Sequence, residues 1–186
     1  MKFRKRFLKT PIEAMRILWQ ATASFIAMIF TGRLHRVSPA FAERINLAVC
    51  GVNECAYCTH LHTKLALRKG VSEQEAAQII AGHEGSVAPQ EARALAFGSR
   101  VAESGGSFDP QEWDTLVDAY GLKKAKHILN VVRVINAGNM CANTAEAFGE
   151  GVVSSRRVRF FITYLMVGPV AFMIKVMGGY KRKPTG

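Results

Sequence analysis

Helix start and stop signals constrain the fold of this chain more than any other feature. Six stretches open with a helix-capping residue or a first-turn proline and run to a glycine suited to end a helix. They span 10–32, 38–51, 53–70, 72–82, 89–105 and 109–121, followed by predicted helices over 122–148 and 156–167. No segment shows the two-residue alternation and hairpin turns of strands. The sequence therefore predicts an all-α protein.

Individual caps fix where several of these helices begin. Thr10, followed by Pro11 and Glu13, has the pattern of a capping box with a first-turn proline. Three later helices are expected to start at caps of the same kind, and Asn53 is expected to cap the helix that carries two cysteines. The predicted caps after Thr10 are Ser38, Asn53, Ser72 and Asp109.

Charge divides the chain into three parts. Residues 1–36 carry eight Lys/Arg and one Glu, residues 37–150 carry ten Lys/Arg and thirteen Asp/Glu, and residues 151–186 carry seven Lys/Arg and no acid. The net charges are therefore +7, −3 and +7, which sum to the +11 of the whole chain. We predict a basic amphipathic helix at 1–32, one helical core domain at 33–150 and a basic, apolar extension at 151–186. No nucleic-acid reading motif accompanies the basic ends, so we expect no nucleic-acid partner.

The two basic ends also hold the longest apolar stretches. Polar residues interrupt 17–30, and 160–174 is a run of fifteen uncharged residues broken at Gly168-Pro169, so no uninterrupted apolar run reaches eighteen residues. One interpretation is peripheral contact with an anionic membrane. The other is that 160–174 packs on the apolar face of 12–30, in the same subunit or a neighbour. We expect a cytoplasmic protein, at most peripherally attached to the inner face of the membrane.

A cluster of reactive side chains lies at residues 53–64, in the stretch NECAYCTHLHTK. On a helix, Cys55, Cys58 and His62 fall at i, i+3 and i+7 and therefore share one face. Glu43, on the preceding helix, could meet that face across the short turn. A Cys-X-X-Cys pair is compatible with a metal site, with buried structural thiols or with dithiol redox chemistry. A zinc site would need four ligands, and no second pair is evident, which favours redox chemistry without metal.

The stretch ERINLAVCGVNECAYCTHLH resembles the active-site segment of alkylhydroperoxidase D and the wider carboxymuconolactone decarboxylase-like family. The shared pattern is a glutamate, eleven residues, Cys-X-X-Cys, three residues and a histidine, and Glu43, Cys55, Cys58 and His62 fit it at every spacing. The resemblance implies a compact, multi-helix alkylhydroperoxidase D-like fold that forms trimers or hexamers. It also implies a thiol peroxidase or disulfide oxidoreductase without cofactor or metal.

By this resemblance, Cys58 would attack a peroxide substrate, Cys55 would resolve the product, and Glu43 with His62 would relay protons. A lipoyl-type or other external dithiol would then reduce the disulfide. One position departs from the pattern, because Tyr57 stands where the best-studied type has a second histidine. This gap keeps open an alternative, a non-catalytic dithiol redox adaptor or sensor. The decarboxylases of the superfamily lack the cysteine pair, so lactone decarboxylation is not expected.

Several other polar residues have less specific interpretations. Asn136, Asn139 and Asn143 would form a stripe on the long helix, expected to be a subunit contact or solvated face rather than a pocket wall. His35, His83 and His127 are each isolated and are predicted to be surface or capping groups. The two remaining cysteines, Cys50 and Cys141, are predicted to be buried core residues.

Overall fold

A computed structural model describes residues 5–83 and 87–149 of this chain. Within these ranges the chain forms seven α-helices and one short 3₁₀-helix, η1, and no strand, which confirms the predicted all-α class. The elements are α1 (Pro11–Phe30), η1 (Arg33–His35), α2 (Pro39–Asn53), α3 (Ala56–Arg68), α4 (Glu73–Ile80), α5 (Pro89–Glu103), α6 (Pro110–Tyr120) and α7 (Leu122–Gly149). The helix predicted at 156–167 and the whole extension at 151–186 lie outside the described residues.

Most of the predicted caps are confirmed. The side chains of Thr10, Ser38 and Ser72 each accept a hydrogen bond from a backbone N–H in the first turn of α1, α2 and α4. Asp109 caps α6 in the same way, by accepting from Gln111. These bonds satisfy amide groups that a helix leaves unpaired at its start.

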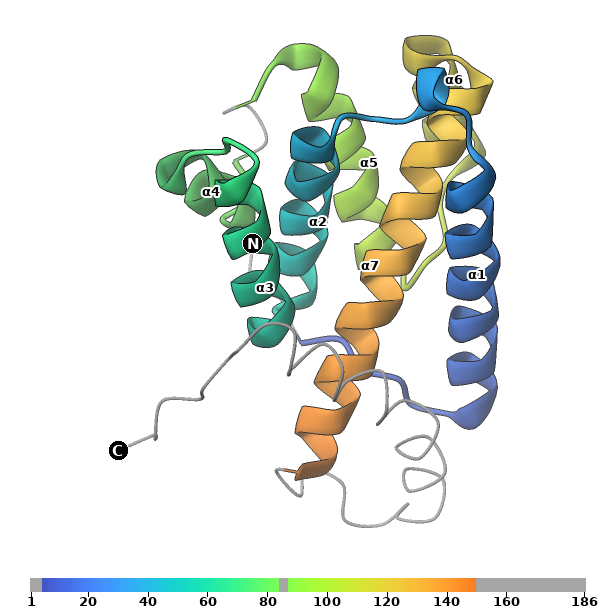
Figure 1. Ribbon diagram of the computed structural model, residues 1–186. Helices are drawn as coiled ribbons and strands as arrows, with labels where there is room; N and C mark the ends of the chain where they lie inside the picture. Colours follow the sequence, from blue (N-terminus) through green and yellow to red (C-terminus); the bar gives the residue numbers. More distant parts are fainter. Residues whose placement is uncertain (1–4, 84–86, 150–186) are drawn as a thin grey trace.

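The long helices α2 and α7 form the centre of the molecule (Figure 1). Helix α2 packs against α3, α4, α5 and α7, while α7 also contacts α1, α5 and α6. The principal core is built from aliphatic side chains of α2, α5 and α7, among them Ile45, Leu95 and Val132, all with no exposed surface. Gly51 permits a close approach of α2 to α4, because a Cβ at this position would lie 2.3 Å from the carbonyl oxygen of Ile80.

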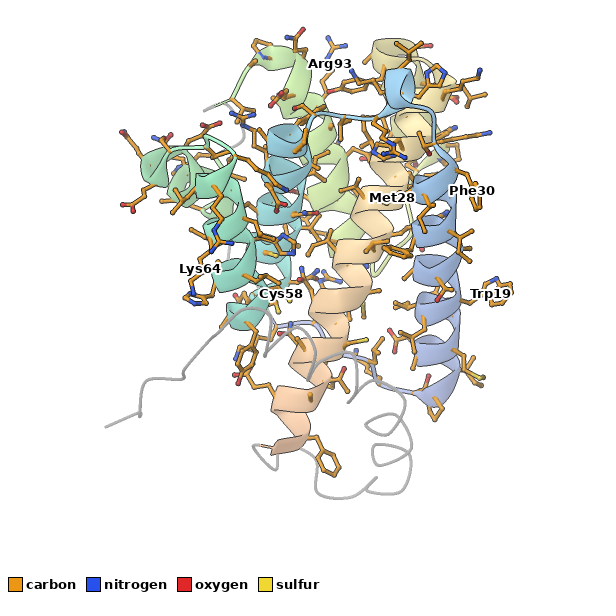
Figure 2. The ribbon with its side chains drawn as sticks, viewed as in Figure 1. Trp19, Met28, Phe30, Cys58, Lys64 and Arg93 are labelled. Atoms are coloured by element: carbon orange, nitrogen blue, oxygen red, sulfur yellow. The ribbon has the colours of Figure 1, made fainter. Side chains whose placement is uncertain are left out.

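Helix α1 packs along α7 on the opposite side from α3 and α4 (Figure 1). Its contact surface consists of small and medium side chains, because Ala14 and Ile17 join a second cluster with Met140 and Cys141. Other large apolar residues of this helix, Trp19 and Phe30 among them, point away from the body of the protein (Figure 2). Helix α1 is therefore apolar both on the face that contacts α7 and on its outer face.

Candidate active site

The turn between α2 and α3 differs from its prediction. Asn53 does not cap α3, because it is the last residue of α2, which therefore extends two residues past Gly51. Glu54 then takes a left-handed backbone conformation with φ of 51°, and the chain enters α3 immediately. The N-cap is Cys55, whose Sγ accepts a hydrogen bond from the backbone N–H of Cys58 at 3.3 Å. This bond holds the two cysteines of the pair next to each other.

The side chain of Asn53 bonds to α7 instead of capping α3. It is completely buried, and its Nδ2 donates to Oδ1 of Asn136 on α7 at 2.9 Å. Nδ2 of Asn143 donates to the backbone carbonyl of Asn53 at 2.7 Å, and the Cys50 thiol donates to Oδ1 of Asn139 at 3.4 Å. The asparagine stripe was predicted to be a subunit contact or a solvated face, and this prediction is wrong. The stripe is a buried row of polar side chains, the polar ladder, which joins α7 to the end of α2.

The other isolated residues agree only in part with their predictions. Cys50 and Cys141 are buried, as predicted, and His83 is exposed. His35 is half-buried in η1. His127 is not a surface group, because it is only 6 % exposed on α7, where burial and the charge of Arg36 lower its pKa.

Glu43 and His62 meet across the α2–α3 turn, as their spacing predicted. Nδ1 of His62 lies 2.7 Å from Oε2 of Glu43, and Nζ of Lys69 lies 2.7 Å from Oε1 of the same carboxylate. Nδ2 of Asn46 also donates to Oε2, at 3.2 Å. Each carboxylate oxygen of Glu43 thus has a nitrogen partner at 2.7 Å. The same contact fixes the imidazole ring of His62 on α3 against a side chain of α2.

These contacts control the ionisation of Glu43. Burial alone would raise the pKa of this carboxyl, which is only 4 % exposed. The hydrogen bonds from His62 and Lys69, the charge of His62 and the bond from Asn46 outweigh burial, and they lower the pKa of Glu43 from 4.5 to about 2. Glu43 is therefore a carboxylate at any physiological pH and can stabilise positive charge on the imidazole.

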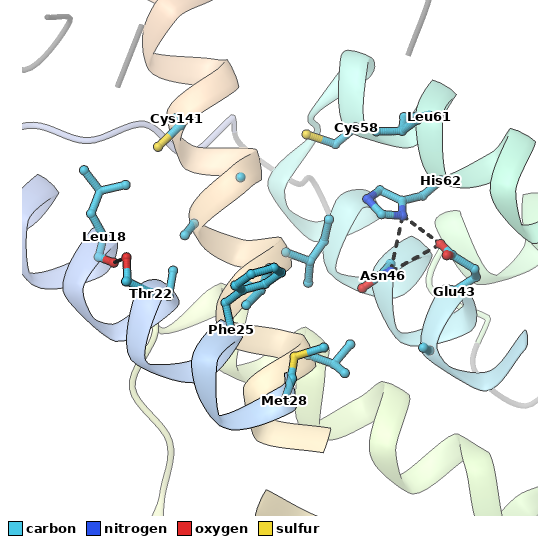
Figure 3. Close-up of a pocket in the computed structure, with 17 residues that line it drawn as sticks. Leu18, Thr22, Phe25, Met28, Glu43, Asn46, Cys58, Leu61, His62 and Cys141 are labelled. Atoms are coloured by element: carbon cyan, nitrogen blue, oxygen red, sulfur yellow. Dashed lines mark hydrogen bonds and ion pairs between the residues drawn. The ribbon is translucent and has the colours of Figure 1, made fainter. Parts of the chain in front are cut away.

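A cavity of about 610 Å³ opens between α1, α2, α3 and α7, and the Glu43–His62 pair lies in its wall (Figure 3). Its polar end consists of Glu43, Asn46, Cys58 and His62. The remainder is mostly apolar and comes from α1, α7 and a few other positions. These lining residues are Leu18, Ala21, Thr22, Phe25, Met28, Ala42, Leu61, Val131, Val134, Ile135, Ala137, Gly138 and Cys141. The cavity can accept a molecule with a long apolar part and a polar, reactive end.

The two cysteines of the pair stand in different relations to this cavity. Cys58 lines it, whereas Cys55 is not among its lining residues in the described part of the chain. Both thiols are almost completely buried. The hydrogen bond with Cys55, followed by burial, raises the pKa of the Cys58 thiol well above its usual range. A substrate in the cavity therefore meets Cys58 first, and Cys58 must transfer its proton to a nearby base before it can act as a thiolate.

The site also contains residues that were not predicted from the sequence. Asn46 lies one helical turn after Glu43, and Lys69 lies seven residues after His62, so helical spacing alone could have indicated both. The contribution of α1 to the cavity has no comparable signal, since it depends on how α1 packs against α7. In the described part of the chain, no group of three or more His, Cys, Asp or Glu side chains is arranged to hold a metal ion.

Comparison with known proteins gives one match to a family model. Residues 17–99 match the model described as the carboxymuconolactone decarboxylase family. The matched segment runs from α1 into α5 and includes Glu43, Cys55, Cys58 and His62. No curated protein and no solved structure matches the chain.

Proposed function

We propose that this chain is an alkylhydroperoxidase D-like thiol peroxidase or disulfide oxidoreductase, because residues 17–99 match the model of the carboxymuconolactone decarboxylase family. The observation that carries the proposal is the position of Cys58. This thiol lines the apolar cavity together with His62, while Sγ of its partner Cys55 accepts a hydrogen bond from the backbone N–H of Cys58 and does not line the cavity. That arrangement supports one cysteine that meets the substrate and a second that resolves the product.

The first step is the activation of Cys58. In our scheme Nδ1 of His62 donates its proton to Oε2 of Glu43, which leaves Nε2 of the same ring to receive the proton of the Cys58 thiol. The carboxylate of Glu43 then stabilises the imidazolium. Glu43 is in this scheme a positioning residue, and Asn46 and Lys69 hold it in place. These two residues are our candidates for the support that the histidine missing at Tyr57 would otherwise give.

The following steps balance without a metal. The Cys58 thiolate attacks the distal oxygen of a hydroperoxide ROOH, the O–O bond breaks, and the alkoxide leaves as ROH with the proton from His62. The resulting sulfenic acid on Cys58 condenses with the Cys55 thiol and releases water. An external dithiol, for which we propose a lipoyl-type compound, reduces the disulfide and is itself oxidised to a disulfide.

Peroxide consumption in the presence of a lipoyl-type dithiol tests this function. We expect the wild-type protein to turn over an alkyl hydroperoxide and Cys58→Ser to be inactive. Cys141→Ser is the matched control, because Cys141 is a buried thiol that lines the same cavity. Equal rates for the wild type and Cys58→Ser would contradict the proposal.

The raised pKa of Cys58 favours one alternative, a dithiol adaptor or sensor that cycles slowly. Such a protein would form the Cys55–Cys58 disulfide but consume peroxide no faster than a free thiol. Measuring the redox potential and the turnover of one preparation separates the two functions. The resemblance also suggests a homo-oligomer, a trimer or hexamer, which light scattering can test.

A further inference from the structure

Helix α1 presents a continuous apolar surface to the outside of the protein. We define its outer face as Ile12, Met15, Trp19, Ile26, Ile29 and Phe30, all of which are about half exposed or more. Trp19 is 75 % exposed and Phe30 is 82 % exposed, and both point away from the protein body (Figure 2). Leu34 in η1 extends this surface at 93 % exposure. An apolar patch of this kind on one helix marks an interaction surface rather than ordinary scatter.

The same helix forms a wall of the reaction cavity. Leu18, Ala21, Thr22, Phe25 and Met28 line the cavity that Cys58 lines on its other side (Figure 3). Phe25 belongs to both environments, since it is 56 % exposed and also lines the cavity. Only the thickness of α1 therefore separates the outer face from the space in front of Cys58.

Length and composition agree with a helix that contacts lipid. Among the described residues, α1 is the one helix long and apolar enough to cross a membrane, with a mean hydropathy of 1.2 over eighteen residues. In this structure, however, Ala14 and Ile17 are buried against α7. A helix that is held along its length by the protein body and apolar on its outside suits the plane of a bilayer surface better than a crossing.

Charge decides which occupant fits the outer face. Residues 5–36 contain six Lys/Arg and one acid, Glu13, which gives +5. A second copy of this face would bring the same positive charge against it. The extension at 151–186 carries +7 and no acid, so it would add further positive charge. An anionic lipid surface provides both an apolar interior and negative charge.

We propose that the outer face of α1 lies on an anionic lipid bilayer and that the substrate is a hydroperoxide on a membrane acyl chain, which reaches Cys58 past Phe25. The inference about the substrate rests on the proposed function, whereas the inference that α1 contacts lipid is independent of it. An oxidised acyl chain matches the cavity, because it is apolar along most of its length and polar at the hydroperoxide. The reaction is the one already given, with ROOH as the acyl hydroperoxide.

Vesicle flotation of the full chain tests the lipid contact. We expect the wild type to float with vesicles of phosphatidylglycerol and phosphatidylcholine, to float poorly with phosphatidylcholine alone, and to be released by high salt. The double variant Ile26→Glu/Phe30→Glu should lose roughly tenfold or more of the bound fraction, because two carboxylates would enter the lipid interface. The matched control is Leu67→Glu/Leu122→Glu, which places the same charges at exposed leucines of α3 and α7 and should float like the wild type.

Turnover of two peroxides separates this inference from the proposed function. With a water-soluble alkyl hydroperoxide, the wild type and Ile26→Glu/Phe30→Glu should have the same rate, since neither residue lines the cavity. With a phospholipid hydroperoxide in anionic vesicles, the wild type and Leu67→Glu/Leu122→Glu should consume the peroxide rapidly, whereas Ile26→Glu/Phe30→Glu should consume it slowly. Flotation without turnover of either peroxide would remove the proposed function and the substrate but leave the lipid contact. Turnover of the soluble peroxide without flotation would overturn the inference alone.

Emission of Trp19 distinguishes the remaining occupants in the Trp113→Phe variant, where it is the single tryptophan. Anionic vesicles should shift its emission to the blue. Emission that is already blue-shifted and protected from quenching without vesicles would show that protein covers the face. Light scattering would then show which protein segment covers the outer face. An oligomer that dissociates in Ile26→Glu/Phe30→Glu would identify a second copy of the chain, and a protein that is monomeric throughout would identify the extension at 151–186. Either result, or flotation that resists alkaline carbonate, would overturn the inference.

Discussion

Nδ1 of His62 lies 2.7 Å from Oε2 of Glu43, and this contact joins α3 to α2 at the polar end of the cavity. The carboxylate is buried, yet the pKa of Glu43 is about 2, because three donors and the charge of His62 outweigh the cost of burial. This buried carboxylate can stabilise the imidazolium that forms when the ring accepts a proton.

Replacement of Glu43 by Gln should slow the chemical step. A glutamine can hold the imidazole by accepting its proton, but it cannot stabilise the imidazolium, so kcat should fall roughly a hundredfold with little change in KM. The control is Glu73→Gln on the exposed first turn of α4. An unchanged kcat for Glu43→Gln would exclude the relay.

The same carboxylate should make the stability of the fold depend on pH. Because the pKa of Glu43 is lowered from 4.5 to about 2 on folding, its charge contributes stability that is fully present above pH 4.5. That contribution, at most roughly 3 kcal/mol, should be lost as the pH falls towards 2. Urea unfolding of the wild type and Glu43→Gln should therefore give a difference that shrinks over this range. A constant difference would contradict the lowered pKa.

Replacement of Cys55 by Ala should make Cys58 more acidic. The hydrogen bond with Cys55 is the largest cause that raises the pKa of Cys58, followed by burial, which the substitution leaves in place. The rate of Cys58 alkylation in the reduced protein, followed by peptide mass spectrometry, should rise at lower pH in Cys55→Ala than in the wild type. Alanine also removes the N-cap of α3, so circular dichroism should first show that the variant is folded. Identical alkylation profiles would show that burial alone sets this pKa.

Loss of the Asn143 side chain should destabilise the whole fold. Its Nδ2 donates to the backbone carbonyls of Asn53 at 2.7 Å and of Arg6 at 3.0 Å, so Asn143→Ala removes the donor to both. We expect the free energy of unfolding to fall by about 1–3 kcal/mol, measured by urea denaturation. Asn130→Ala, at a half-buried position of the same helix, is the control and should cost less. Equal effects of the two substitutions would mean that the ladder does not hold α7 to α2.

Local signals in the sequence determined most of the helix starts. The Thr10, Ser38, Ser72 and Asp109 caps were predictable because each bonds a backbone N–H only two or three residues away. The meeting of Glu43 and His62 followed from the same kind of reasoning, since one short turn joins their helices and the helical period fixes their faces. The resemblance to a known motif added the pairing of these residues with the cysteines.

Only the tertiary structure decided the features that depend on distant partners. Asn53 has the residue type of a cap, but it bonds to Asn136, which lies 83 residues further along the chain, and Cys55 takes the cap instead. The apolar period of α1 was visible in the sequence, yet Ala14 and Ile17 face α7 whereas Trp19 and Phe30 face outward. The reason is physical: a helical period shows that a helix has an apolar side, whereas the shape of the neighbouring helix decides which side chains fit against it.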